Sequence, residues 1–264
     1  MSITSILIGV AAILAISVAF SLIGQGGGVL YVPLLLALGM TVHDAATTSL
    51  FVIVATSISA AIIYRKRRTV DWKLALVIEP PTIALAFAGG LLANSIDATV
   101  LKYIFAGVLI LAGFLMLGQV KGNGDAVSSG WGYWNRRLGD KSYTVRLPGL
   151  MPVTAAAGFV AGMIGVSGGI FKLPAMVLIG RVPMRVAIGT SSLMVATTAL
   201  AGLAGHVTGG SFNIVMALPL AAAAFVGGRA GSSLSMRVKA PALKTFFAVV
   251  LFLVSAWMIV STLV

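Results

Sequence analysis

The strongest constraint on the fold of this chain is a series of apolar runs, many about 20 residues long, that recur along all 264 residues. A helix of that length crosses a hydrocarbon core about 30 Å thick. Hydrophobic residues make up 59% of the sequence and charged residues only 9%, whereas a soluble domain carries about a quarter charged residues. The sequence therefore predicts an all-α polytopic membrane protein.

Three further features of the composition narrow the function classes. The first run, 3–23, lacks a preceding basic segment and a following small-residue cleavage site, so we expect it to be part of the fold rather than a signal peptide. The absence of cysteine excludes disulfides and thiolate-based metal or redox sites. The net charge of +12 comes mostly from short segments between apolar runs, where Lys and Arg set membrane orientation, so we expect no nucleic-acid partner.

The apolar runs divide into two sets of five, separated by a stretch rich in Gly, Ser and charge at 119–149. We therefore expect a first membrane repeat at 1–118, a linker at 119–149 and a second membrane repeat at 150–264. The expected helical elements are 3–23, 28–39, 45–64, 74–93, 99–118, 150–164, 169–180, 186–206, 212–233 and 245–263.

An ordered series of matching residues indicates that the two sets are copies of one unit. Gly27, Gly28 and Pro33 recur as Gly168, Gly169 and Pro174, 141 positions later. Further matches along the chain are Thr48 and Ser49 with Thr190 and Ser191, Pro81 with Pro219, Phe87 with Phe225, and Gly89 and Gly90 with Gly227 and Gly228.

The relative orientation of the two copies follows from the short elements 28–39 and 169–180. At 1.5 Å per residue each is roughly 18 Å long, which is too short to span the membrane comfortably. If each forms a hairpin with the preceding element, fifteen of the eighteen basic residues fall on one side, which the positive-inside rule makes cytoplasmic. We therefore expect inverted repeats in the cytoplasmic membrane of a prokaryote, with both termini outside and the linker in the cytoplasm.

The sequences "GQGGG" (24–28) and "GVSGG" (165–169) form the tips of these two hairpins. Broken backbone in the membrane persists only where it is buried in protein or lines a wet cavity. Each tip precedes a short helix, whose first N–H groups are unpaired and carry partial positive charge. Two such N-termini meeting near the bilayer midplane would bind an anion. The alternative is that the glycines only let helices pack closely.

Polar residues in and near the tips would complete such a site. Hydroxyls suit an oxyanion because they donate a hydrogen bond without adding negative charge, although Ser and Thr in helices also bond to their own backbone. The candidate substrate-binding residues are Gln25, Gly26, Gly27, Gly28, Tyr31, Thr48, Ser49, Ser167, Gly168, Gly169, Lys172, Thr190 and Ser191.

Few charged residues lie inside the apolar runs. Lys172 stands in the second short helix, where it either attracts substrate or snorkels to an interface, and its counterpart in the first is Tyr31. Glu79 is a candidate carrier of a coupling proton, or else an interfacial acid paired with Lys73 or the basic cluster 65–68. His43 and His206 fall at expected outer ends and are expected at the surface. We expect no cofactor and no metal.

At these positions the sequence resembles the TauE/SafE family of sulfite exporters and anion permeases over nearly its whole length. The resemblance rests on "GQGGGVLYVPLLLALG" with "AATTSL", and on "GVSGGIFKLPAMVLIG" with "AIGTSSL". It implies passive or ion-coupled movement of small anions such as sulfite or sulfonates, with the tip glycines and the prolines at 33 and 174 as shared positions. Ser167 departs from this pattern, since the first tip has Gly26 there. Family members are described with about eight spans, fewer than our ten elements because we count the short helices separately.

The leading hypothesis is a secondary transporter that exports a small sulfur oxyanion, sulfite or an organosulfonate such as sulfoacetate, by alternating access around the tips. An anion channel would use the same two opposed helices. An intramembrane enzyme would need a catalytic pair or metal cluster, and only one acid lies at depth. A scaffolding protein would not need two breaks in the membrane. No P-loop is present, so ATP hydrolysis is not expected of the chain.

Overall fold

The computed structural model describes residues 3–93, 95–117, 131–139, 141–166, 168–209 and 212–239, with scattered helical positions from 242 to 260. The first helices are α1 (Ile3–Ser21), α2 (Gly28–Ala37), α3 (Val42–Lys66), α4 (Trp72–Ala93) and α5 (Ala98–Leu117). After a hairpin of β1 (Tyr133–Leu138) and β2 (Lys141–Arg146) come α6 (Leu147–Ile164), α7 (Gly169–Pro174), the π-helical turn η1 (Ala175–Ile179), α8 (Met184–Gly209) and α9 (Ile214–Ser235). The predicted helical membrane architecture is confirmed in this part of the chain, where each expected element up to 233 has its helix, but the chain is not all-α because β1 and β2 form a hairpin.

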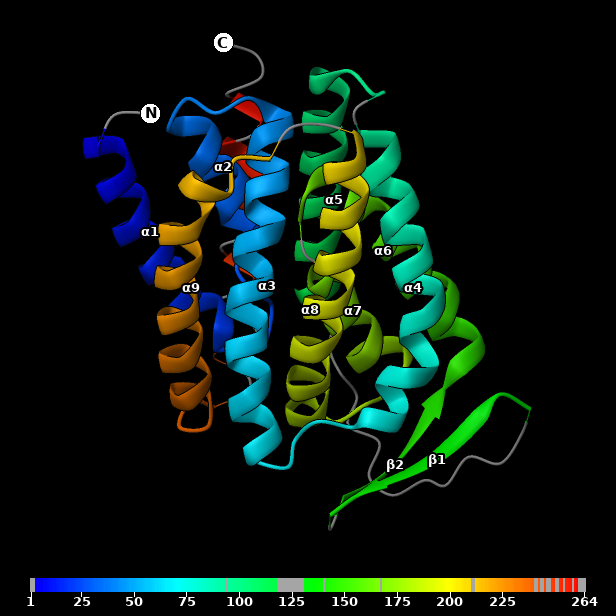
Figure 1. Ribbon diagram of the computed structural model, residues 1–264. Helices are drawn as coiled ribbons and strands as arrows, with labels where there is room; N and C mark the ends of the chain where they lie inside the picture. Colours follow the sequence, from blue (N-terminus) through cyan, green and yellow to red (C-terminus); the bar gives the residue numbers. More distant parts are fainter. Residues whose placement is uncertain are drawn as a thin grey trace.

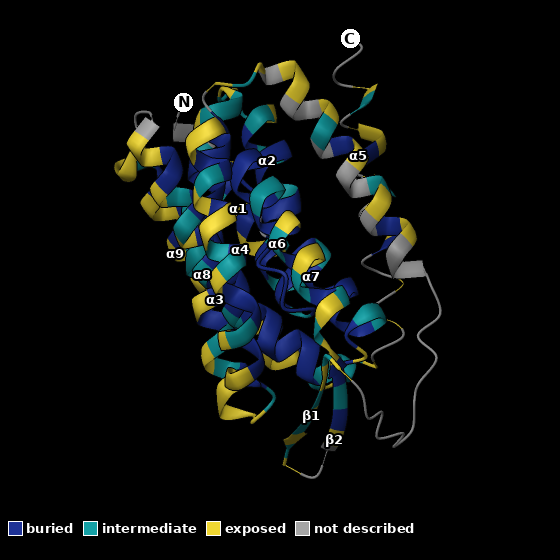
Figure 2. Cartoon of the chain, turned by 90° about the vertical axis from the view of Figure 1, so that its right-hand side faces the viewer, coloured by how far each residue is buried: buried dark blue, intermediate teal, exposed yellow. Residues whose placement is uncertain are grey.

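Within the described residues, the helices α3, α4, α6, α8 and α9 are long and apolar enough to cross a membrane. Large apolar side chains lie exposed on the outside of the bundle, among them Leu76 and Val215. Buried residues gather along the centre, and α5 stands at one side with much of its surface exposed (Figure 2). A surface this apolar requires lipid rather than water around it, so the chain is a multi-pass membrane protein.

The long helices pack in two matching sets. Helix α4 packs against α6 and α8, and helix α9 packs against α1 and α3. Helices α3 and α8 lie side by side in the middle and run in opposite directions (Figure 1). Exchanging α1, α3 and α4 for α6, α8 and α9 leaves this pattern of contacts unchanged.

The glycine pairs at 89–90 and 227–228 make these contacts possible. A β-carbon on Gly89 would lie 2.1 Å from the carbonyl oxygen of Phe159 in α6. A β-carbon on Gly227 would lie 2.7 Å from the carbonyl oxygen of Leu14 in α1. Both glycines therefore allow a closer helix approach than any larger residue, which is the packing role that small residues have in membrane bundles.

The hairpin of β1 and β2 was not expected from the sequence, which indicated only a polar linker. Tyr133 pairs with Arg146 and Leu138 with Lys141 in an antiparallel register. The segments "YWNRRL" and "KSYTVR" hold the aromatic and β-branched residues that favour strands. The hairpin projects from the end of the bundle opposite the start of α1 (Figure 1). The linker residues 119–130 lie outside the described part of the chain.

Asp71, just before α4, fastens this hairpin to the bundle. Arg136 of β1 donates to Asp71 Oδ1 at 2.6 Å and to Oδ2 at 3.0 Å, and the Tyr143 hydroxyl donates to Oδ2 at 2.5 Å. Burial of the carboxyl would raise its pKa, but the hydrogen bonds from Arg136, Tyr143 and the Leu74 N–H together outweigh burial and hold the Asp71 pKa below its ordinary value. The Asp71 N–H in turn donates to Thr190 Oγ1 of α8 at 2.9 Å.

Candidate functional site

The two glycine-rich tips meet inside the bundle. A β-carbon on Gly169 would lie 2.7 Å from Gln25 Oε1 and 2.6 Å from Val195 Cγ2. A β-carbon on Gly26 would lie 3.0 Å from Val195 Cγ1. One residue of α8 therefore touches both tips, and the side chain of Gln25 reaches the start of α7. Gln25, Gly26, Gly169 and Val195 are all buried, so a β-carbon at Gly169 has no free space.

Each tip also packs against the long helix that belongs to the other tip. A β-carbon on Gly24 would lie 2.3 Å from the carbonyl oxygen of Ile188 in α8. A β-carbon on Gly165 would lie 2.3 Å from the Cα atom of Ala46 in α3. Gly165 has φ +78°, a conformation that favours glycine. These reciprocal contacts fix the two breaks beside each other between α3 and α8.

Lys172 and Glu79 form a buried ion pair beside the second tip. Lys172 Nζ lies 2.9 Å from Glu79 Oε2 and 3.0 Å from Oε1, and the lysine is fully buried. The lysine side chain lies back over its own tip, because a β-carbon on Gly168 would lie 3.3 Å from Lys172 Cε. The expected alternatives for Glu79, pairing with Lys73 or the cluster 65–68, are therefore wrong. Snorkelling of Lys172 is wrong as well, since its ammonium points into the bundle.

Hydroxyl and carbonyl groups of α8 complete the coordination of this ion pair. Lys172 Nζ also donates to Thr198 Oγ1, and it lies 3.3 Å from the carbonyl oxygen of Met194. Thr197 and Thr198 each donate to Glu79 Oε1 at 2.6 Å. An ammonium has three donors, so the carboxylate, the hydroxyl and the carbonyl occupy all of them.

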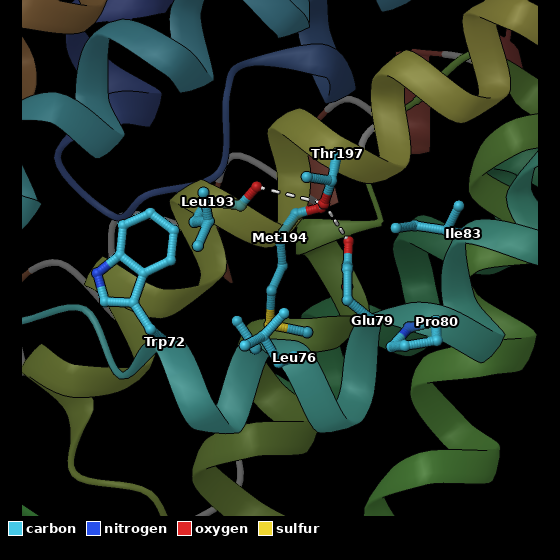
Figure 3. A pocket seen from close by; sticks show the side chains of 9 residues that line it. Trp72, Leu76, Glu79, Pro80, Ile83, Leu193, Met194 and Thr197 are labelled. Carbon is cyan, nitrogen blue, oxygen red and sulfur yellow. Dashed lines mark hydrogen bonds between the residues drawn. The ribbon is translucent and has the colours of Figure 1, made fainter.

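Glu79 also borders a pocket of about 200 Å³ between α4 and α8. Figure 3 shows Glu79 and Thr197 at one wall, with Trp72, Leu76 and Leu193 among the surrounding apolar side chains. The pocket is otherwise apolar, and Glu79 is 6% exposed through it. The carboxylate is thus nearly but not completely enclosed.

The first tip has a neutral arrangement at the matching place. The Tyr31 hydroxyl lies 2.7 Å from Ser17 Oγ of α1 and 3.0 Å from Thr56 Oγ1 of α3. Tyr31 is fully buried and lies back over Gly27, whose β-carbon would lie 2.5 Å from Tyr31 Cζ. Thr56 stands 142 positions before Thr198, the same spacing that separates Thr48 from Thr190. Tyr31 and Lys172 therefore occupy equivalent places with different chemistry.

The Thr–Ser pairs lie within their helices rather than at their starts, because α3 begins at Val42 and α8 at Met184. Ser49 and Ser191 are fully buried, and neither hydroxyl has a hydrogen-bond partner among the described residues. Thr48 is buried, and Thr190 Oγ1 accepts the bond from the Asp71 N–H. Two buried hydroxyls at matching positions are thus available to a ligand.

Sequence reasoning missed Ser57, which is fully buried beside the first tip. A β-carbon on Gly26 would lie 2.5 Å from Ser57 Oγ, and this hydroxyl too has no partner within the described part of the chain. Thr197 and Thr198 were also missed, although they stand one or two helical turns after the "GTSS" motif of α8. Ser167 lies outside the described residues.

The two histidines differ in their surroundings. His43 is half-buried, with Nε2 3.1 Å from the carbonyl oxygen of Ala93. His206 is buried, with Nε2 2.8 Å from the carbonyl oxygen of Gly162. The expected surface location is therefore wrong for His206, which joins α8 to α6. No group of three or more His, Asp or Glu residues able to hold a metal occurs in the described residues.

These features define a multi-pass helical membrane protein with two broken helices that meet at a buried polar centre. The model of the family "Sulfite exporter TauE/SafE" matches residues 8–258, and the chain belongs to this family. It is 28% identical to "Probable membrane transporter protein YunE" of Bacillus subtilis over 90% of this chain and 92% of that protein. It is also 28% identical to "Probable membrane transporter protein YfcA" of Escherichia coli K12, over 88% and 82% respectively. The family and these names indicate a membrane transporter rather than an enzyme.

Proposed function

We propose that this protein is a secondary transporter that exports a small sulfur-containing oxyanion, sulfite or an organosulfonate such as sulfoacetate, across the cytoplasmic membrane. The observation that carries the proposal is the junction of the two tips at Val195, with the Lys172 ammonium beside it. Family membership supports sulfite as the first candidate among small anions.

The proposed substrate site lies between the two tips. Helix α2 begins at Gly28, directly after the glycines of the first tip. The N-terminus of a helix carries unpaired N–H groups and the positive end of the helix dipole, which favour an anion there. The buried hydroxyls of Ser49, Ser57 and Ser191 are donors without partners in the described residues, and an unmet buried donor costs about 1–3 kcal/mol. An oxyanion supplies acceptors for such donors, which supports a substrate role for this region.

Alternating access follows from a second proposal, that residues 1–118 and 150–264 are inverted repeats. The exchange symmetry of the helix contacts and the opposite directions of α3 and α8 support it (Figure 1). Rocking of one repeat against the other would expose the tips first to one side and then to the other. We propose that both termini face outside and that the hairpin of β1 and β2 lies in the cytoplasm, because most basic residues gather at that end.

The test is anion-induced thermal stabilisation of the purified protein, measured with sulfite, sulfoacetate, sulfate, thiosulfate, taurine and chloride. A ligand that binds only the folded state raises the apparent melting temperature. We expect sulfite or sulfoacetate to stabilise the wild type, and the Gly169→Ala variant to lose this shift because its new methyl group enters the junction. Gly107→Ala in α5 is the matched control, since its β-carbon would meet nothing within 4 Å.

No shift with any of these anions would overturn the proposal. A full shift in Gly169→Ala would also overturn it, because the substrate would then bind somewhere else.

A further inference from the structure

The ion pair of Lys172 and Glu79 raises a problem for an anion that binds at the tips. Lys172 is the only buried lysine or arginine among the described residues, but all three donors of its ammonium are already occupied. A substrate oxygen can reach Lys172 only if one partner leaves. The Met194 carbonyl is part of the α8 backbone, and Glu79 has a longer side chain than Thr198 and already borders the pocket between α4 and α8, so Glu79 is the partner that can withdraw.

The charge balance of the site leads to the same partner. The pair is neutral as it stands, and an added anion would leave at least one net negative charge in a region nearly closed to water. An unpaired charge is strongly unfavourable in a protein interior. If Glu79 takes up a proton, the anion replaces it as the counter-ion of Lys172. A singly charged anion such as hydrogen sulfite then leaves the site neutral, and a doubly charged one such as sulfoacetate leaves one negative charge fewer than it would beside ionised Glu79.

We propose that the substrate anion and Glu79 compete for Lys172, so that each anion bound adds one proton to the Glu79 carboxylate. In this step the ion pair between the Lys172 ammonium and Glu79 opens and a new ion pair forms between the ammonium and the anion. One O–H bond forms on Glu79, with the proton coming from the aqueous phase. The inference rests on the proposed anion site and assigns its coupling ion.

Local hydrogen bonds can hold Glu79 in both protonation states. As a carboxylate it accepts from Thr197 and Thr198 at 2.6 Å each. As an acid it can donate to the Thr197 hydroxyl, because a hydroxyl rotates between donor and acceptor roles. The Thr197 hydroxyl has a second acceptor in the Met194 carbonyl at 3.0 Å, which takes its proton in that arrangement.

Other charged groups on the neighbouring elements do not face Glu79. Helix α6 carries no titratable side chain. Helix α8 carries Arg185 and His206 at its two ends, and each is more than two turns from Thr197. On α4 itself Lys73 lies six residues before Glu79, at the end next to the hairpin. Lys172 of α7 is therefore the group whose charge Glu79 senses directly.

The test is infrared difference spectroscopy of the reconstituted wild-type protein, recorded before and after addition of sulfite and, in parallel, sulfoacetate. Protonation of Glu79 produces a new carboxylic-acid C=O band. Sulfite has no carboxyl group, so its own protonation cannot produce this band. The same band is expected with sulfoacetate, because its own carboxyl group is ionised near neutral pH and gives no acid band. The new band is expected to be absent in Glu79→Gln and to remain in Gly107→Ala, whose β-carbon meets nothing within 4 Å.

A second measurement does not depend on any variant. The affinity of wild-type protein for sulfoacetate, measured by thermal stabilisation, is expected to fall about tenfold per pH unit as pH rises above neutral, because one proton is linked to each anion. Glu79→Gln imitates the neutral acid, so its affinity is expected to be independent of pH in that range.

The outcomes separate this inference from the proposed function. An anion that stabilises the wild type without a new acid band overturns the competition and leaves the anion site standing. A band that persists in Glu79→Gln overturns the assignment of the proton to this residue. If neither sulfite nor sulfoacetate binds, the proposed function falls, and the inference falls with it.

Discussion

Tyr31 and Lys172 occupy equivalent places, yet one is neutral and the other carries a charge. Tyr31 joins α1 to α3 through two hydroxyl partners, and its network contains no ionised group. Lys172 joins α4 to α8 through a carboxylate and a hydroxyl. The same backbone break therefore supports two kinds of side-chain network.

This difference indicates that the backbone sets the shape of the site and that the side chains set its charge. Both tips supply glycine turns and close contacts with the opposite long helix. Only the second supplies a cation, Lys172, which pairs with Glu79 of α4. Charged groups are rare at depth in membrane proteins and mark functional positions. We infer that the first tip mainly shapes the site, whereas the second determines its charge.

The largest expected effect is the difference in stability between a variant without the Lys172 ammonium and a variant without the Tyr31 hydroxyl. Lys172→Met leaves Glu79 buried without its counter-ion, and we expect it to lower the free energy of unfolding by about 3–5 kcal/mol. Tyr31→Phe removes interhelical hydrogen bonds, which average about 0.6 kcal/mol in a membrane protein. Unfolding of both variants in detergent with a denaturing surfactant measures the difference.

The double variant Glu79→Gln with Lys172→Met provides the control for this prediction. It removes both charges, so it is expected to be more stable than Lys172→Met alone. Equal losses in Lys172→Met and Tyr31→Phe would show that the charge on the second tip has no special role in stability.

The next prediction sharpens the comparison of the two backbone breaks. Gly165→Ala forces a side chain into a left-handed conformation, at a cost of about 1–2 kcal/mol. It also places a methyl group against Ala46, which adds about 1–3 kcal/mol of overpacking. Gly39→Ala has φ +88° but nothing within 4 Å of its β-carbon, so it carries only the conformational cost. Thermal unfolding of the two variants would show the same loss if the contact between the second tip and α3 were unimportant.

A third prediction concerns Asp71, whose backbone N–H donates to Thr190 Oγ1. No such bond to the matching Thr48 occurs in the described residues. Asp71→Asn weakens the bonds to Arg136 and Tyr143 and is expected to cost about 1–3 kcal/mol in the docking of the hairpin. Limited proteolysis of the hairpin measures this at neutral pH.

The pH dependence of this effect has a definite sign. Because the Asp71 pKa is lowered in the folded protein, its stabilisation is complete above its ordinary pKa of about 3.9 and is lost as pH falls through the folded value. The wild type and Asp71→Asn should therefore become equally susceptible to an acid protease at the lowest pH. A difference that grows in acid would contradict this account.

The smallest effect compares two serines of α3, of which Ser57 lies beside the first tip and Ser59 faces α9. Ser59 Oγ donates to the Phe225 carbonyl oxygen at 2.7 Å, so Ser59→Ala is expected to cost about 0.6 kcal/mol of stability. Ser57 has no such partner in the described residues, so Ser57→Ala should leave stability unchanged and weaken the binding of sulfite or sulfoacetate. Thermal unfolding with and without each anion gives both values. Weakened binding in Ser59→Ala alone would remove Ser57 from the proposed site.

Much of the fold could be predicted because the membrane restricts what an apolar run can do. The positions of the short helices followed from glycine clusters and helix length, and α2 and α7 begin at the expected Gly28 and Gly169. The hairpin was missed because its strands are short and lie in a polar, charged segment, where alternation is a weak signal.

The candidate site was predictable in its backbone but not in its side-chain partners. Lys172 and Glu79 were each recognised because a charge within an apolar run is unusual. Their pairing depends on how α4 and α7 pack around α8, and 93 residues separate them in the chain. Ser57 resembles any small polar residue of a membrane helix until Gly26 is seen beside it.

The most direct measurement of the central claim is counterflow of radiolabelled sulfite in proteoliposomes containing wild type, Lys172→Met or Tyr31→Phe. The account predicts saturable counterflow for the wild type, most of it retained in Tyr31→Phe and lost in a folded Lys172→Met. Flux that does not saturate and shows no counterflow would contradict a transporter and indicate a channel. Counterflow that survives in Lys172→Met would show that the charged tip does not bind the anion.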